Sequence, residues 1–298
     1  MIPPIASHKT MSELRVFGVA DARALLPYPD PNCNKYTRGG LAVIAGSAAY
    51  PGAAILAASA APRAGAGYVR LVTPAAAAQV ARQHLISVPV VEADAAAGVF
   101  CEQSVESTLD GCAKMRAALM GPGIGRAPET VAFVRSLLLQ LDISVVIDAD
   151  ALFALDAGTP LSASAGCYAI ITPHEGEAAR LLGRKVQDRE QDALLLARTL
   201  NCVCVLKGPD TLIANPEGTV RCVDIGGPEL AKAGTGDVLA GMIGGLLAQG
   251  LAPMDASCLG VYLHSIAGQL CAQDLTAISV MPEDLLRYIG PAIRHVEK

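Results

Sequence analysis

The sequence has no tryptophan and only four phenylalanines among 298 residues, while alanine and glycine are abundant, so small side chains must pack closely in the interior. It has no long basic run and a net charge of −5, which makes nucleic acid an unfavourable partner. No stretch of about 18 uninterrupted apolar residues occurs, so no membrane span is expected.

The nine cysteines include no C-x-x-C pair, and their number is odd. No secretory signal precedes them, because the first ten residues carry His8 and Lys9 and no long apolar region. Cys202 and Cys204 alternate within an apolar run, which places them on one side of a strand and favours core filling over metal binding. These observations predict a reduced protein of the cytoplasm.

Two common phosphate-binding signatures are also absent. No G-x-x-x-x-G-K-[ST] string occurs, which excludes a P-loop. The glycines between Gly121 and Gly125 are followed by Arg126, so G-x-G-x-x-G is not completed and a dehydrogenase-type dinucleotide site is not indicated.

Short apolar runs alternate with helical patterns along a chain that is 52% hydrophobic, enough for a sizeable core. Strands are predicted at 41–45, 68–72, 116–120, 143–147, 168–171 and 202–206, followed by a hairpin of 211–214 and 219–223. Helices are expected at about 21–26, 52–64, 129–140, 175–182, 188–200 and over the remainder. Strands joined by helices imply an α/β fold, with a mostly parallel central sheet covered on both faces.

Segments that can carry chemistry begin where these strands stop. Glycine, proline, aspartate, histidine and lysine are concentrated in the segments 46–53, 121–125, 148–150, 172–177 and 207–211. Because parallel strands end on one rim of a sheet, where open α/β folds bind ligands, we expect these segments to meet there.

The most informative segment is Ala233-Gly234-Thr235-Gly236-Asp237, which leads into apolar residues at helical spacing. Asp237 is therefore expected near a helix N-terminus, where unpaired N–H groups and the helix dipole favour a phosphate. Asp237 could merely cap the helix, but a cap does not require glycines on both sides of a threonine. We expect Gly234, Thr235 and Gly236 to form an anion loop and Asp237 to be the catalytic carboxylate.

Other polar residues allow both a functional and a structural interpretation. Asp148 and Asp150 would point the same way in extended backbone and suit Mg²⁺ held mainly through water and phosphate, although Asp150 could instead cap the next helix. Lys207 fits a nucleotide site beside the anion loop, yet alone it could be a solvated loop lysine. His174 is a candidate binding residue, whereas His264 is interpreted as a packed or capping histidine. No set of protein ligands for a metal is assigned.

Taken together, these segments resemble the ribokinase-like superfamily, and specifically the ADP-dependent NAD(P)H-hydrate dehydratases. The resemblance runs from about Lys35 to the C-terminal helices. It is carried by the segments 51–54, 65–67, 121–123, 148–152, 172–174, 177, 207–211 and 233–237. The glycine–aspartate loop is shared with the sugar and vitamin kinases of the superfamily, whereas Thr-Pro-His-x-Gly-Glu combined with Lys-Gly-x-x-Thr is more particular to the dehydratases.

The resemblance implies a three-layer α/β/α sandwich that dehydrates (6S)-NADHX and (6S)-NADPHX to NADH and NADPH. It implies ADP as co-substrate, release of AMP and phosphate, and Mg²⁺ as cofactor. By matching positions, the residues expected to touch the hydrated dinucleotide are Ala53, Gly123, His174 and Asp237. Those expected to hold the adenine nucleotide are Lys207, Gly208, Pro209, Asp210, Thr211 and Gly236.

The resemblance also implies a homotetramer, and it divides the chain into an N-terminal extension, 1–34, and a dehydratase domain, 35–298. The epimerase domain fused to some members is not visible, because about 35 residues are too few to contain it. The sequence departs from the family pattern at Asn34, at Glu175, and at Gly227 and Glu229, which stand where Asn and Gly are usual. These departures concern fine contacts and nucleotide preference.

Two other functions share part of these features. A vitamin or sugar kinase of the same fold would also use Asp237, but it would release a stable phosphorylated product. A non-catalytic regulator would bind nucleotide without turnover, and the intact Asp237 argues against it.

Overall fold

The computed structural model of the chain describes residues 15–96, 98–156, 160–161 and 167–298, so residues 1–14 of the predicted extension lie outside the description. The strands are β1 (Arg15–Val16), β2 (Gly40–Ile44), β3 (Tyr68–Pro74), β4 (Val90–Ala93), β5 (Ala95–Ala96), β6 (Val99–Phe100), β7 (Ala117–Met120), β8 (Ser144–Ile147), β9 (Ala169–Ile171), β10 (Val203–Leu206), β11 (Thr211–Ala214) and β12 (Val220–Val223). The α-helices are α1 (Val19–Leu25), α2 (Pro51–Arg63), α3 (Ala75–His84), α4 (Ser104–Cys112), α5 (Pro128–Gln140), α6 (Glu175–Leu182), α7 (Arg189–Leu200), α8 (Thr235–Ala248), α9 (Pro253–Leu275) and α10 (Pro282–Glu297). Two 3₁₀ helices are η1 (Ala149–Ala154) and η2 (Pro228–Leu230).

The central sheet of the described chain contains ten strands in the order β1-β12-β11-β10-β9-β8-β7-β2-β3-β4. Neighbouring strands are parallel except where β11 runs antiparallel to both β10 and β12. The predicted mostly parallel sheet and its terminal hairpin are confirmed.

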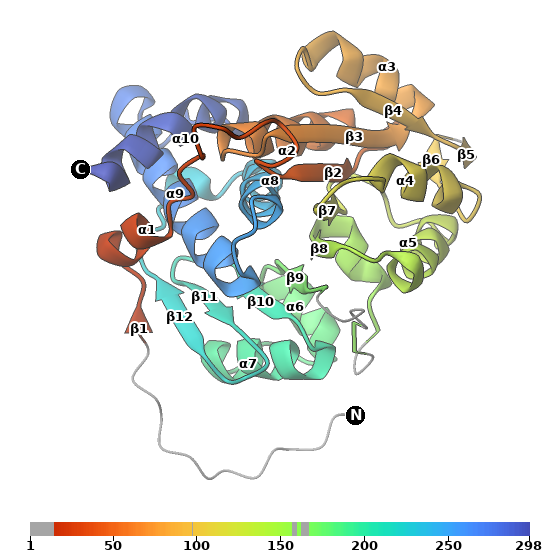
Figure 1. Cartoon of the computed structure of the whole chain (residues 1–298). Coiled ribbons are helices and arrows are strands. Elements are labelled where there is room, and N and C mark those ends of the chain that lie inside the picture. The colour runs from red at the N-terminus through yellow and green to blue at the C-terminus, as the bar shows by residue number, and fades with distance from the viewer. Residues whose placement is uncertain (1–14, 97, 157–159, 162–166) are drawn as a thin grey trace.

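Helices cover both faces of this sheet, as Figure 1 shows. Strand β2 illustrates why: Leu41 and Val43 belong to a core shared with α2, α8, α9 and α10, whereas Ala42 and Ile44 belong to a core shared with α4, α5, α6 and α7. Successive side chains of a strand point to opposite faces, so an uninterrupted apolar strand needs a cover on each side. The predicted three-layer α/β/α sandwich is confirmed.

Small residues let α8 approach α2 closely. A Cβ at Gly241 would lie 2.3 Å from the Ala57 carbonyl oxygen, and one at Gly245 would lie 2.6 Å from the Ala61 carbonyl oxygen. Both distances are far below van der Waals contact, so only glycine fits at these two positions. The close packing predicted from the composition thus fixes α8, and with it the helix N-terminus that carries Asp237.

The segment before residue 35 also contributes to the packed body. Strand β1 pairs with β12 in parallel, and Phe17 is buried with its ring 5.8 Å from that of Tyr262, in an edge-to-face arrangement. Helix α1 contacts α9 and α10. The division at residue 34 stays a prediction about where the dehydratase domain begins.

The elements predicted with bounds agree with the observed ones to within two residues at each end, and the helices expected over the remainder are α8, α9 and α10. No element was predicted between residues 75 and 112, where α3, β4, β5, β6 and α4 lie. Alanine contributes little contrast between the apolar and polar faces of a helix or strand. The alanine-rich start of this region, residues 75–78, therefore shows only weak periodicity. None of the helices in the described part of the chain is long and apolar enough to cross a bilayer.

Candidate active site

The segments that follow the strands meet at one rim of the sheet. Strands β10, β9, β8, β7 and β2 are consecutive parallel neighbours, so their carboxyl ends lie side by side. Backbone hydrogen bonds join the loops: Gly46 donates to Pro122 O at 2.8 Å, and Lys207 donates to Pro173 O at 2.9 Å. The predicted convergence is confirmed.

Gly123 lies against the beginning of α2, where Ala53 is located. Its φ is +64°, and a Cβ there would be 2.8 Å from Tyr50 O and 2.9 Å from Ala53 Cβ. Both the left-handed backbone and the close approach require glycine. Two residues expected to touch one ligand are therefore neighbours, although 70 positions separate them.

The segment expected to form an anion loop begins α8. Gly234 precedes the helix with φ +100°, and the Thr235 hydroxyl donates to Leu230 O (2.7 Å) and Lys232 O (2.8 Å). The Thr235 side chain thus shapes the loop and is itself buried. The N–H groups of Gly236 and Asp237 have no acceptor in the described part of the chain, as expected for the first turn of a helix. Backbone amides, not the threonine side chain, are available to an anion.

Asp237 occupies the third position of α8 and is partly buried. Burial, and next the negative charge of Asp148, raise its pKa to about 7, while Lys207 acts in the opposite direction. A carboxylate with a pKa near neutrality is a far better proton acceptor than an ordinary aspartate, whose pKa is about 3.9. The sequence located this residue but did not indicate its basicity, because a pKa shift depends on neighbours distant in the chain.

Two cavities of similar size flank the N-terminus of α8. The first, which we call the Asp237 cavity, has a volume of about 520 Å³ and is lined by Tyr50, Ala53, Gly123, Gly125, Arg126, Asp150 and Asp237. The second, the Lys207 cavity, has a volume of about 530 Å³. Its lining includes Lys207, Gly208, Pro209, Thr211, Thr235, Gly236 and His264. Of the six residues expected to hold the adenine nucleotide, five line the Lys207 cavity, and the exposed Asp210 does not.

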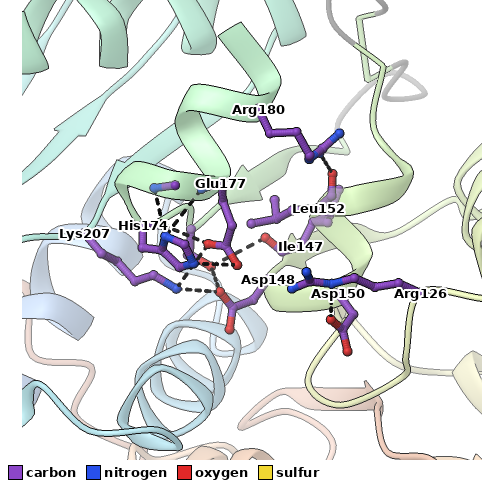
Figure 2. Close-up of polar contacts among 11 residues, drawn as sticks. Arg126, Ile147, Asp148, Asp150, Leu152, His174, Glu177, Arg180 and Lys207 are labelled. Carbon is purple, nitrogen blue, oxygen red and sulfur yellow. Dashed lines mark hydrogen bonds and ion pairs between the residues drawn. The ribbon is translucent and has the colours of Figure 1, made fainter. Parts of the chain in front are cut away.

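Lys207 lies at the centre of an ion-pair network (Figure 2). Its Nζ is 2.9 Å from Asp148 Oδ1 and 4.0 Å from Glu177 Oε2, and a Cβ at Gly236 would be 3.6 Å from it. Burial alone would lower the pKa of Lys207, but Asp148 and Glu177 hold it above its usual value. Burial raises the pKa of Glu177, against the effect of Lys207. Lys207 is thus a charged, positioned group, and the alternative of a solvated loop lysine is wrong.

The expectation that Asp148 and Asp150 point the same way is wrong. Ala149 has φ +50° and begins η1, so the backbone between the two aspartates is not extended. Asp148 is buried and accepts from Lys207 and from the Thr172 hydroxyl (2.6 Å), whereas Asp150 accepts from Gly125 N (3.0 Å) and pairs with Arg126 Nε at 2.6 Å. Neither a shared metal site nor a helix cap describes this pair.

His174 begins α6 and caps it. Its Nδ1 accepts from the N–H groups of Gly176 (3.0 Å) and Glu177 (3.4 Å), and Glu177 in turn accepts from His174 N at 2.8 Å. His174 lines a third cavity, of about 250 Å³, with Arg126, Ala149, Phe153, Gly176, Glu177 and Arg180. It therefore does not line the cavity that contains Ala53, Gly123 and Asp237.

The two departures ahead of the anion loop are coupled. A Cβ at Gly227 would be 2.2 Å from Glu229 Oε2, so the Glu229 side chain occupies the space that a side chain at position 227 would need. Glu229 is buried in η2.

His264, interpreted from sequence as packed, is 6% exposed, and burial lowers its pKa to about 4.

The sequence did not single out several residues that line these cavities. Tyr50, Arg126 and Arg180 belong to no recognisable motif, and Arg126 stands out in the sequence only because it interrupts a glycine pattern. In the described ranges, no group of three or more His, Cys, Asp and Glu side chains could hold a metal ion.

Comparison with known proteins adds an independent observation. A sequence profile of the NAD(P)H-hydrate dehydratase family matches residues 41–291. The bifunctional NAD(P)H-hydrate repair enzyme of Moorella thermoacetica is 36% identical over 289 residues, which cover 95% of this chain and 54% of that protein. The chain thus spans about half the length of such bifunctional relatives.

Two further proteins match over nearly their whole length. The ADP-dependent (S)-NAD(P)H-hydrate dehydratase of Xanthomonas campestris is 32% identical over 266 residues, covering 87% of this chain and 89% of that one. The crystal structure of the ADP/ATP-dependent NAD(P)H-hydrate dehydratase from Bacillus subtilis, co-crystallised with ATP and Mg²⁺, superimposes with a TM-score of 0.85 at 29% identity. That match covers 97% of this chain and all of the other.

Proposed function

The chain belongs to the NAD(P)H-hydrate dehydratase family, and we propose that it dehydrates (6S)-NADHX and (6S)-NADPHX to NADH and NADPH at the expense of ADP. AMP and phosphate are the other products. The co-substrates named for the Xanthomonas and Bacillus enzymes support the use of an adenine nucleotide.

One observation carries this proposal: the first turn of α8 faces two cavities at once. Gly236 lines the Lys207 cavity, and the next residue, Asp237, lines the Asp237 cavity. A phosphoryl donor in the first cavity and an alcohol in the second would meet at the unpaired amides of this turn. Phosphoryl transfer depends mainly on such positioning and on charge stabilisation.

The reaction follows from the chemistry of the leaving group. Hydroxide leaves poorly and phosphate leaves well. Asp237 accepts the proton of the substrate hydroxyl while the β-phosphoryl group of ADP bonds to that oxygen and AMP departs. The lone pair of the ring nitrogen then expels phosphate from the carbon that carried the hydroxyl. Loss of a proton from the next ring carbon restores the carbon–carbon double bond. The pKa of about 7 suits Asp237 to the first step.

Lys207 and the α8 amides would stabilise the charge that moves between the phosphoryl oxygens. Lys207 lines its cavity and is held in place by Asp148 and Glu177, so its ammonium needs no reorganisation. The positions predicted for substrate contact, Ala53 and Gly123, border Asp237, which supports their assignment.

The side chains present do not fit a resident metal, because Asp148 is committed to Lys207 and no cluster of three ligands exists in the described ranges. We propose that Mg²⁺ enters bound to the phosphates of the nucleotide, which is how Mg²⁺ usually binds in such sites.

A homotetramer located in the cytoplasm stays a prediction. A native mass near four times 30.6 kDa and cell fractionation would test it.

The decisive experiment incubates the protein with ADP, Mg²⁺ and chemically prepared NADHX or NADPHX, and follows the absorbance of the reduced nicotinamide. Recovery of that absorbance with stoichiometric AMP and phosphate supports dehydration. A stable phosphorylated product from pyridoxal or a hydroxymethylpyrimidine would support the vitamin kinase instead. Nucleotide binding without turnover of any substrate would indicate a regulator.

A further inference from the structure

Beside the Asp237 cavity lies a second cavity that the reaction itself does not use. The cavity around His174 shares one lining residue with it, Arg126. The substrate of the proposed function consists of two nucleosides joined by a pyrophosphate. With its hydroxylated ring at Asp237, the rest of the molecule must leave the Asp237 cavity in some direction, and the Lys207 cavity is taken by ADP.

Arg126 lines both cavities at their junction, and its guanidinium is positioned by a hydrogen bond to Asp150. Its Nε donates to Asp150 Oδ1 at 2.6 Å, and Asp150 Oδ2 accepts from Gly125 N, so the carboxylate fixes the inner edge of the guanidinium (Figure 2). The Arg126 Nη atoms have no acceptor in the described part of the chain, and the side chain is 55% exposed. A positioned guanidinium with free N–H groups matches the geometry of phosphate oxygens.

A second guanidinium lies on the far side of this junction. Arg126 Cζ is 5.7 Å and Arg180 Cζ is 5.0 Å from the ring centroid of Phe153. Arg180 donates to the carbonyls of Leu152 and Leu155, which do not neutralise its charge. Burial, and next the repulsion from Arg126, lower the pKa of Arg180. Two cations around one aromatic ring favour an anion between or beside them.

Two carboxylates close to this junction are already engaged, Glu177 of the His174 cavity and Asp150 of the Asp237 cavity. Glu177 accepts from His174 N and faces Lys207, and Asp150 is bonded to Arg126 and Gly125. The carboxylate bonded to Arg126 thus occupies its Nε and leaves its Nη groups available to a phosphate.

We infer that Arg126 binds the pyrophosphate of the hydrated dinucleotide, and that the adenosine half extends from there into the His174 cavity toward Phe153 and Arg180. This inference rests on the proposed function and specifies how its substrate is held. It also accounts for the position of His174: the dinucleotide spans two cavities, so His174 can contact it without lining the Asp237 cavity. Because Arg126 lies at the middle of the ligand, it would serve NADHX and NADPHX equally.

The test compares Arg126→Gln with Arg82→Gln, a control that removes an arginine of similar exposure paired with Glu92 at the edge of the sheet. For Arg126→Gln we expect KM for both hydrated dinucleotides to rise about tenfold or more, as loss of a charge-assisted hydrogen bond implies. The kcat and the KM for ADP should change less than about twofold. Hydrated reduced nicotinamide riboside, which has no pyrophosphate, should give the same KM with both variants and with the wild type.

An unchanged dinucleotide KM, or an equal loss on the riboside, would overturn the inference. So would an effect confined to NADPHX, because that would place the 2′-phosphate at Arg126. Calorimetric binding of NADH to the resting protein separates this inference from the proposed function, because it needs no turnover. If the wild type binds NADH at least about tenfold tighter than Arg126→Gln does but dehydrates no hydrate, the subsite stands and the proposed reaction fails. Equal affinity of the two proteins for NADH, or no binding to the wild type, rejects the subsite.

Discussion

The Asp237 cavity and the Lys207 cavity are almost equal in volume, yet the side chains that line them differ in charge and polarity. The Asp237 cavity is lined by three charged side chains, Arg126, Asp150 and Asp237, on segments that come from distant parts of the chain. The Lys207 cavity is lined mainly by glycine, proline and apolar side chains, with Lys207 as its charged residue. This difference fits the proposal that phosphoryl transfer to the hydrate takes place at the Asp237 cavity and that the adenine nucleotide binds in the Lys207 cavity.

The difference shows how one helix start can serve two tasks. Gly236 offers a backbone amide without a side chain, and Asp237 offers a carboxylate one position later. Because adjacent residues of a helix point in different directions, consecutive positions reach different cavities. Substitutions on the two sides should therefore separate catalysis from nucleotide binding.

The largest expected effect is that of Asp237→Asn. Removing the proton acceptor should lower kcat by about 10²–10⁴-fold, while Kd for ADP stays within about threefold. The matched control is Asp255→Asn, because Asp255 occupies the same third position of helix α9 but lines neither cavity. Single-turnover kinetics and calorimetry with ADP measure the two quantities. An Asn variant with wild-type kcat would end the assignment of Asp237 as base.

Lys207→Met should affect both cavities and the stability of the fold. It leaves the buried Asp148 without its cationic partner, which should lower the free energy of unfolding by about 3 kcal/mol. It should also weaken ADP binding, and it should shift the acidic limb of the kcat/KM profile to higher pH, because Lys207 lowers the pKa of Asp237. Guanidinium denaturation and pH profiles provide the measurements.

The double variant Asp148→Asn with Lys207→Met is the control for stability. Removing both charges avoids an unpaired buried carboxylate, so it should be more stable than Lys207→Met alone. If the double variant is the less stable of the two, the ion pair is not what Lys207 contributes to the fold.

Smaller effects are expected from Gly123→Ala and Gly236→Ala, which should alter KM for different substrates. At position 123 a Cβ meets Tyr50 and Ala53 and the φ is left-handed, which should raise KM for the hydrate about tenfold and leave KM for ADP unchanged. At position 236 the nearest atom is Lys207 Nζ at 3.6 Å, an ordinary contact, so the effect should be smaller and confined to ADP. Identical KM patterns for the two variants would show that the cavities are not functionally separate.

The smallest effect concerns stability and pH. In the folded protein the pKa of Asp237 is about 7, above the value of 3.8 expected when it is exposed. The native state therefore binds more protons between these values, and this group reduces stability as pH rises through that window. The melting temperature of Asp237→Asn relative to wild type should increase from pH 5 to pH 7 and then level off, as calorimetry can measure. A constant difference across this range would contradict the raised pKa.

Much of the candidate site could be located from sequence because its motifs lie at strand ends. Residues 121–125, 172–177 and 207–211 follow apolar runs, and the parallel topology then requires them to share one rim. Asp237 could be located because helical periodicity begins immediately after its glycines. The alternation of Cys202 and Cys204 likewise predicted core filling, which their burial confirms.

What the sequence determined by itself was the order of elements, the parallel sheet, and the placement of an acidic residue at the start of a glycine-flanked helix, because these depend on periodicity and local backbone preference. Only the tertiary structure decided that Asp148 pairs with Lys207, that Asp150 turns instead to Arg126, and that His174 belongs to a neighbouring cavity. The partners in these contacts are far apart in the sequence. Asp150 and Arg126 are separated by 24 positions, as are Asp148 and Thr172, and Asp148 and Lys207 are separated by 59. Such pairings, and the pKa values that follow from them, are set by packing in three dimensions, which no local pattern encodes.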